Sequence, residues 1–320
     1  MSNGSYQFFD LKPAMGSMRA EVLAGLTRAG KQISPKYFYN ESGSGLFEEI
    51  TRLPEYYLTR TEIALFEAHS AAIAEQVGQG GCLVEYGSGS SLKIRKLLET
   101  VRPEAYVPVD ISGDHLQNNA RALQADFPWL SLFPVCTDFT AAFALPAPVQ
   151  GLSKTGFFPG SSIGNFEPTA AVQLLGNICA TLGAGGYLLL GVDRKKDTAL
   201  LEAAYDDAAG VTARFNLNML THLNDTLGAD FAVDQFSHRA SYHPALGCVQ
   251  MFLVSDCEQQ VRIDDTVLEF AKGEAIHTEN SFKYHPEEFA ALASRAGFEQ
   301  TAFWTDSQQH YSVFLLQVRA

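Results

Sequence analysis

The sequence predicts an α/β fold in which a mostly parallel sheet, with helices on both faces, is interrupted by an α+β insertion. Between residues 82 and 192, short apolar runs alternate with amphipathic segments, as in right-handed βαβ units. Between residues 236 and 270, closely spaced apolar runs indicate antiparallel strands. We therefore expect a first domain from residues 60–196 and 285–320, and a second from residues 1–59 and 197–284.

The elements are assigned from apolar spacing and turn residues. Helices are expected at residues 18–27, 91–100, 114–124, 170–182, 197–227 and 286–296, with another capped by Thr59 or Thr61. Strands are expected at residues 82–86, 105–109, 132–136, 156–159, 187–192, 236–242, 249–254, 261–263, 267–270, 298–304 and 312–318. Residues 40–45 are expected to form turns.

Composition restricts the class of partner. Lys and Arg total 23 and Asp and Glu total 36, which gives a net charge of −13. Nucleic acids and anionic membranes require a basic surface, so neither is an expected partner. The five cysteines contain no CxxC pair, and the histidines show no metal-ligand spacing, so we expect free thiols and no metal. No secretion signal or membrane span is recognised, and we expect a cytoplasmic monomer.

A glycine-containing turn follows the first strand of the alternating region. The segment Glu85-Tyr86-Gly87-Ser88-Gly89-Ser90-Ser91 leads from an apolar run into a helix. Glycines there allow positive φ and let a ligand approach the backbone, while the first N–H groups of the helix remain available. Such turns also occur as plain packing devices, so this turn alone does not identify a ligand.

The acidic residues at the ends of neighbouring strands narrow the choice of ligand. Asp110 is placed to accept hydrogen bonds from ribose hydroxyls, and Asp138 from an adenine amino group beside the backbone of Phe139. Glu85 is a further acid near the turn. A dinucleotide site would have a third glycine where this chain has Leu92. These features favour the cationic S-adenosylmethionine over NAD.

The chain resembles the S-adenosylmethionine-dependent histidine Nα-methyltransferases of ergothioneine biosynthesis, which form hercynine. The resemblance extends over nearly the whole chain, with departures at Tyr86 and Asn280. Its motifs are Lys36-Tyr37-Phe38-Tyr39, Thr51-Arg52-Leu53-Pro54-Glu55-Tyr56-Tyr57, Glu85-Tyr86-Gly87-Ser88-Gly89-Ser90, Gly160-Ser161-Ser162-Ile163-Gly164-Asn165, Ala204-Tyr205-Asp206-Asp207-Ala208-Ala209-Gly210-Val211-Thr212 and Glu279-Asn280-Ser281-Phe282-Lys283. The resemblance implies a Rossmann-like methyltransferase domain and a second, substrate-binding domain.

The resemblance also implies roles for individual residues. For the cofactor, Tyr39 and Lys93 would hold the methionine end, Gly87 would lie against it, Asp110 would bind the ribose, and Asp138 with Phe139 the adenine. For the substrate, Tyr56 and Asn165 would meet the α-amino group, Tyr205 the carboxylate, Glu279 and Ser281 the imidazole, and Met251 would pack beside it.

The chemistry of methyl transfer agrees with these residue types. A charged α-ammonium has no lone pair and must lose a proton before it can attack the methyl carbon. Asn165 can orient the amine but cannot act as a base, so we hypothesise that Tyr56 relays the proton to water. Three rounds yield a quaternary ammonium, which tyrosine faces attract. Glu279 accepts from an imidazole N–H and would discriminate against amino acids that lack one.

Three alternatives remain open from the sequence. The same chemistry could act on tyrosine or tryptophan. An NAD-dependent oxidoreductase is disfavoured by Leu92 at the third glycine position. A catalytically inactive sensor would bind S-adenosylmethionine and report it to a partner without forming product.

Overall fold

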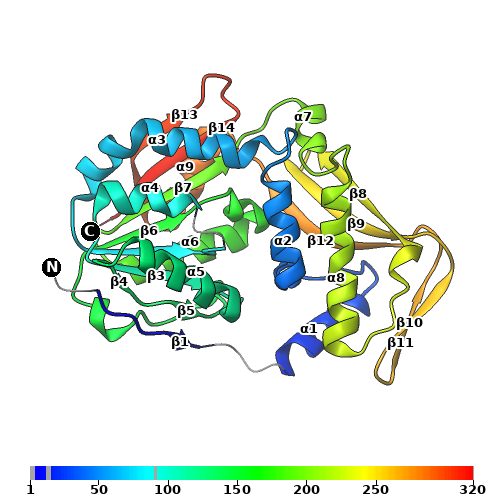
Figure 1. Ribbon diagram of the computed structural model, residues 1–320. Helices are drawn as coiled ribbons and strands as arrows, with labels where there is room; N and C mark the ends of the chain where they lie inside the picture. Colours follow the sequence, from blue (N-terminus) through cyan, green and yellow to red (C-terminus); the bar gives the residue numbers. More distant parts are fainter. Residues whose placement is uncertain (1–3, 12–15, 90–91, 320) are drawn as a thin grey trace. The chain divides into compact units, whose positions relative to one another are not determined.

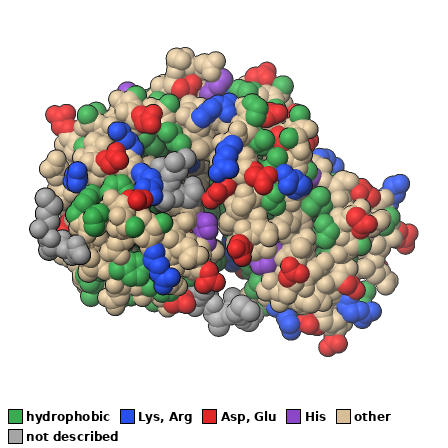
Figure 2. All heavy atoms as spheres, viewed as in Figure 1, with side chains coloured by type: hydrophobic (Ala, Val, Ile, Leu, Met, Phe, Trp, Pro, Cys, Tyr) green, Lys and Arg blue, Asp and Glu red, His purple; other side chains and the backbone are tan. Residues whose placement is uncertain are grey.

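The computed structural model describes residues 4–11, 16–89 and 92–319, and the chain divides into two compact units. The first comprises Met1–Pro13, Leu58–Lys195 and Lys283–Ala320, and the second comprises Ala14–Tyr57 and Lys196–Phe282. Among the described residues, no helix is both long enough and apolar enough to cross a membrane. On the face shown in Figure 2, acidic and basic side chains are interspersed.

The first unit is built on a mixed sheet whose central strands are parallel. Its strands are β1 (Phe9–Asp10), β2 (Cys82–Tyr86), β3 (Ala105–Asp110), β4 (Ser131–Leu132), β5 (Val135–Cys136), β6 (Lys154–Phe158), β7 (Tyr187–Asp193), β13 (Phe298–Thr305) and β14 (Tyr311–Val318). Their order is β1-β5-β3-β2-β6-β7-β14-β13, and β4 also pairs with β3. The hairpin β13–β14 joins antiparallel to β7. From β2 the chain continues to β3 and β5 on one side of β2, and it then returns to form β6 on the other side. The strand order therefore reverses at β2, and sheets of this kind bind ligands at such a point.

The helices that connect these strands lie along the sheet (Figure 1). They are α3 (Tyr57–Val77), α4 (Leu92–Val101), α5 (Gly113–Asp126), α6 (Pro168–Leu182) and α9 (Pro286–Arg295), with short 3-10 turns η2 (Ala147–Val149) and η3 (Ser162–Asn165). Ile94, Leu97 and Leu98 are buried at helical spacing, which gives α4 one apolar face. Every residue of β2 is buried, as expected of a parallel strand covered on both faces.

The second unit combines helices with antiparallel strands. Its helical elements are α1 (Gly16–Leu26), η1 (Pro35–Phe38), α2 (Glu41–Ile50), α7 (Thr198–Ala203), α8 (Val211–Leu227) and η4 (Val233–Gln235). Its strands are β8 (Phe236–His243), β9 (Cys248–Ser255), β10 (Gln259–Ile263), β11 (Thr266–Phe270) and β12 (Ala275–Phe282). They form the sheet β12-β9-β8 and the hairpin β10-β11. Helix α8 packs against α2, β8 and β9 (Figure 1). The predicted fold class, an α/β sheet domain with an α+β part, is confirmed.

Several predicted elements differ from those observed. The helix expected at residues 197–227 is two helices, α7 and α8, because Gly210 has φ of 70° and Asp207 accepts the first N–H groups of α8. The turns expected at residues 40–45 are the start of α2, capped by Asn40, whose Oδ1 accepts from the N–H of Gly43 at 2.8 Å. Neither Thr59 nor Thr61 caps α3, which begins at Tyr57.

Two strands were also misread. The strand expected at residues 132–136 is interrupted between β4 and β5, where the chain passes through Phe133 and Pro134. Strand β12 was not predicted, because its polar residues interrupt the apolar alternation that marks a strand. This strand carries Glu279 and Ser281, so it matters for the candidate site.

Candidate functional site

The glycine turn after β2 is shaped as the sequence predicts. Gly87 has φ of 72°, which a residue with a side chain rarely adopts. The N–H groups of Gly87 and Ser88 donate to the carbonyl of Val109 at 2.9 and 3.1 Å, which ties the turn to β3. A Cβ at position 87 would lie 3.6 Å from the ring of Phe139. Gly87 and Phe139, both predicted to contact the cofactor, therefore lie side by side; Ser90 and Ser91 lie outside the described residues.

Asp110, at the end of β3, holds the same turn from the other side. Its Oδ2 accepts from the N–H of Gly89 at 3.2 Å and its Oδ1 from the N–H of Ser112 at 2.9 Å. Burial raises the pKa of Asp110, and these two backbone donors oppose the rise. A carboxylate has about four acceptor positions, so two bonds leave room for the hydroxyls of a ribose. The residues present thus fit an adenosine ligand.

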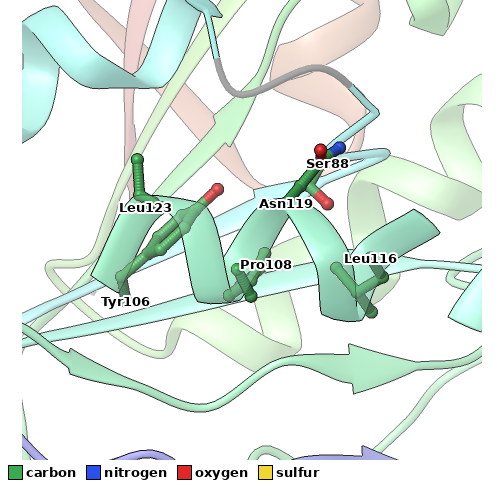
Figure 3. A pocket seen from close by; sticks show the side chains of 7 residues that line it. Ser88, Tyr106, Pro108, Leu116, Asn119 and Leu123 are labelled. Atoms are coloured by element: carbon green, nitrogen blue, oxygen red, sulfur yellow. The ribbon is translucent and has the colours of Figure 1, made fainter. Parts of the chain in front are cut away.

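A small hollow lies beside this turn, between β3 and α5. It is lined by Ser88, Tyr106, Pro108, Leu116, Asn119, Ala120 and Leu123. Ser88 and Asn119 lie close together in Figure 3. The Asn119 amide donates to the carbonyl of Gly89, which secures the turn from α5. Sequence reasoning missed Asn119, because an asparagine inside a predicted helix carries no local signal of such a contact.

Glu85 and Asp138 use their carboxyl groups in different ways. Glu85 is buried in β2 beside the Tyr106 hydroxyl, and burial raises its pKa to about 8. Glu85 is therefore mostly protonated at neutral pH and contributes less negative charge than a sequence count suggests. The Asp138 carboxylate accepts from the N–H and hydroxyl of Thr140 at 3.0 and 2.6 Å, which folds its own loop.

Lys93, in the first turn of α4, is held by a buried carboxylate. Its Nζ lies 2.6 Å from Oε2 of Glu62, whose side chain is fully buried. Both carboxylate oxygens of Glu62 accept from the N–H of Gly160 at 2.9 Å. Gly160 leads into η3, which ends at Asn165. The structure therefore connects Lys93 with the turn that carries Asn165.

In the second unit, the predicted tyrosines form part of one aromatic cluster. The ring of Tyr56 meets that of Tyr205 edge-on with centroids 6.4 Å apart, and Phe47 meets Tyr39 and Tyr56 at 5.9 and 6.2 Å. The hydroxyl of Tyr205 is hydrogen-bonded to Oγ of Ser281 at 2.7 Å. Tyr205 and Ser281, assigned to opposite ends of the substrate, are thus direct neighbours. Tyr39, assigned to the cofactor, belongs to this unit rather than to the unit that carries Gly87.

Strands β12 and β9 present the remaining substrate residues. Glu279 pairs directly with Met251 across the ladder, and Ser281 lies two residues further along β12 on the same face. Glu279 is 7% exposed and Ser281 and Met251 are each 2% exposed, so all three are buried. Asn280 points to the other face, where its Oδ1 accepts from the Gln250 amide at 2.9 Å. The departure at Asn280 therefore leaves the Glu279 face unchanged.

A histidine that sequence reasoning missed, His238, is hydrogen-bonded to the backbone of Tyr205. One ring nitrogen of His238, Nε2, lies 2.9 Å from the carbonyl of Tyr205, so it must carry the proton. The amide nitrogen of Asn216 donates to the Phe252 carbonyl at 3.1 Å and lies 2.8 Å from Nδ1 of His238, which therefore accepts. Burial lowers the pKa of His238, in keeping with this neutral form.

Comparison with known proteins assigns the family. A model of the family described as "Histidine-specific methyltransferase, SAM-dependent" matches residues 18–318. The chain belongs to this family. The membership predicted from the motifs is therefore confirmed, as are the class of enzyme, an S-adenosylmethionine-dependent methyltransferase, and S-adenosylmethionine as its methyl donor.

Family members are similar over most of the chain. The histidine N-alpha-methyltransferase of Mycolicibacterium smegmatis is 41% identical over 308 residues, covering 94% of this chain and 95% of that protein. The protein of the same name from Mycobacterium tuberculosis is 38% identical, covering 93% and 94%. Ergothioneine biosynthesis protein 1 of Neurospora crassa is 30% identical, covering 89% of this chain and 33% of that longer protein.

Proposed function

We propose that this chain transfers methyl groups from S-adenosylmethionine to the α-amino group of L-histidine. Three transfers would give Nα,Nα,Nα-trimethylhistidine, hercynine, as an intermediate of ergothioneine biosynthesis. The observation that carries the proposal is the buried Glu279 beside Ser281 and Tyr205, in a chain of a histidine-specific family. A carboxylate has about four acceptor positions, and the imidazole N–H of histidine can donate to one of them.

One set of the proposed site residues would bind S-adenosylmethionine, and the other set would bind histidine. S-adenosylmethionine supplies an electrophilic methyl group on its sulfonium. Lys93, Gly87 and Tyr39 would hold the methionine end, Asp110 the ribose, and Asp138 with Phe139 the adenine. Once the donor is fixed, the remaining task is to orient a neutral amine.

The acceptor would be bound by its three polar groups. Tyr205 would bind the carboxylate and Glu279 with Ser281 the imidazole, with Met251 packed beside the ring. Tyr56 and Asn165 would meet the α-amino group, and Tyr56 would relay its proton to water. Tyrosine rings near the amine would also attract the quaternary ammonium of the product.

The proposal includes a setting for the enzyme. All five cysteines are free thiols, and three of them are buried, which suits a reducing compartment such as the cytoplasm. We propose that the enzyme acts there as a monomer on a free amino acid, without nucleic-acid or membrane partners. Light scattering of the purified protein tests the monomer.

Mass spectrometry of the reaction product tests the central proposal. We expect histidine and S-adenosylmethionine to give a product three methyl groups heavier than histidine. Initial rates on a panel of free amino acids provide the comparison, and faster turnover of tyrosine or tryptophan would refute the histidine assignment. Binding of both ligands by calorimetry without any methylated product would instead identify an inactive sensor.

A further inference from the structure

A buried carboxylate outside the predicted site residues links two of them. Glu62 is a residue of α3, and it is fully buried. An ionised carboxylate is costly to bury unless it is paired and hydrogen-bonded. Glu62 meets both conditions, since Oε2 pairs with Lys93 at 2.6 Å, Oε1 accepts from the Tyr311 hydroxyl at 2.8 Å, and both accept from the Gly160 N–H.

The surrounding backbone is shaped to admit this carboxylate. A Cβ at Gly191 of β7 would lie 1.9 Å from Oε1 of Glu62 and 2.3 Å from the Tyr311 hydroxyl oxygen. Only glycine at position 191 leaves space for both groups. The site is therefore built around the Glu62 carboxylate by α3, α4, β7, β14 and the turn that begins at Gly160.

The partners of Glu62 connect the two ends of the proposed reaction. Lys93 is assigned to the methionine end of the cofactor, and Gly160 begins the turn that ends at Asn165, assigned to the acceptor amine. An ammonium has three donors, so the bond to Glu62 leaves two on Lys93 for the cofactor carboxylate. A carboxylate that holds both partners sets their separation.

We propose that Glu62 is a positioning residue for methyl transfer. It holds the Lys93 ammonium and the Gly160–Asn165 turn at a fixed separation. This inference rests on the proposed function, because the roles of Lys93 and Asn165 do. Glu62 touches neither ligand in this proposal and acts only through these two partners.

The substitution Glu62→Gln tests the proposal. Glutamine keeps the size and an acceptor for the Gly160 N–H but removes the charge that holds Lys93. We expect S-adenosylmethionine to bind about tenfold more weakly and kcat to fall about tenfold, as for loss of a charge-assisted hydrogen bond. Calorimetry without any acceptor measures the first effect and single-turnover kinetics the second.

The matched control is Tyr311→Phe. It removes another hydrogen bond from the same carboxylate without touching Lys93 or Gly160, so we expect the dissociation constant and kcat to stay near those of the unsubstituted enzyme. The double variant that combines Glu62→Gln with Lys93→Met should bind the cofactor no more weakly than Lys93→Met alone, because Glu62 acts on binding through Lys93.

Two results would overturn the inference. One is a Glu62→Gln enzyme with unchanged cofactor affinity and kcat. The other is a loss of activity accounted for entirely by a smaller folded fraction. If Glu62→Gln does not fold, Glu62→Asp withdraws the carboxylate by one methylene and is judged by the same two measurements. Failure of the proposed function is separate, because it would appear in the product of the unsubstituted enzyme.

Discussion

Glu85 shows how a single buried residue changes the meaning of a charge in the sequence. Its carboxyl group lies inside the sheet, where burial raises its pKa to about 8, while the Tyr106 hydroxyl and Lys93 oppose the rise. Below its unfolded pKa, near 4.5, the group is protonated in both states. Between that value and about 8, the folded state keeps a proton that the unfolded state releases. The stability linked to Glu85 is therefore lost as the pH rises through about 8.

Glu85→Gln should remove this dependence, because glutamine stays neutral at every pH. We expect the fall in Tm of the unsubstituted protein between pH 5 and pH 8.5 to become shallower in the variant. Calorimetric scans of both proteins across that range measure the difference. Parallel curves for the two proteins would show that Glu85 titrates with an ordinary pKa.

Glu279 is expected to determine the choice of amino acid. Glu279→Ala should lower kcat/KM for histidine about a hundredfold or more, because the imidazole N–H would lose its buried acceptor. The dissociation constant of S-adenosylmethionine should not change. Steady-state kinetics with calorimetry checks both, and Asn280→Ala, on the opposite face of β12, is the control. An unaltered kcat/KM for histidine would remove Glu279 from the acceptor site.

Tyr56 carries the proposed proton relay. Tyr56→Phe keeps the ring but removes the hydroxyl, so we expect kcat to fall about a hundredfold and the pH–rate profile to shift. The neighbouring Tyr57→Phe is the control, since the Tyr57 hydroxyl accepts from Lys196 instead. If the Tyr56→Phe enzyme keeps both the rate and the profile, the relay hypothesis is wrong.

At the scale of elements, the break between α7 and α8 depends on local capping. Asp207 accepts from the N–H groups of Val211 and Thr212 at 2.9 and 2.7 Å, and Gly210 supplies the positive φ before α8. The motif around Tyr205 occupies this break. A helix running through the break would remove the loop that places Tyr205 beside Ser281.

Asp207→Ala should therefore destabilise the protein by about 1–2 kcal/mol through loss of the cap. Asp206→Ala is the matched control, because the Asp206 side chain is 58% exposed, and it should change stability by less than about 0.5 kcal/mol. Urea denaturation of both variants provides the free energies. Equal effects of the two substitutions would contradict the capping role.

Elements that were predicted and elements that were missed differ in how local their signals are. The parallel strands β2, β3, β6 and β7 were found because each is a short apolar run that ends at a turn residue. Helix α2 was missed because its Gly and Ser residues are typical of turns, while its packing against α8 outweighs that propensity. Strand β12 was missed because its buried polar residues do not alternate with apolar ones. The strand forms through its pairing with β9, which is not visible in the local sequence.

At the scale of the whole molecule, a buried ion pair joins distant parts of the first unit. Nζ of Lys283 lies 2.8 Å from Oδ2 of Asp193, and neither side chain is exposed. The N–H of Tyr284 donates to the Asp193 carbonyl at 3.2 Å, and the N–H of Asp193 donates to Oγ of Ser161 at 2.9 Å. The pair thus fixes the end of β7 to the segment that follows β12.

Lys283→Met should cost about 3–5 kcal/mol, because it leaves the Asp193 carboxylate buried without its cation. Adding Asp193→Leu should recover much of that loss, since both charges are then absent. Free energies of unfolding for the two single variants and the double variant complete the cycle. Additive losses would show that the two charges do not depend on each other.

The sequence by itself determined the fold class, the family and the candidate residues, because periodicity, turn residues and motifs are written in neighbouring positions. Only the tertiary structure decided how buried charges are balanced: Glu62 with Lys93, Asp193 with Lys283, and the proton kept by Glu85. It also decided that Glu279 faces Met251 across a ladder. These properties depend on partners far away in the chain and on exclusion of water, and neither is encoded by local sequence.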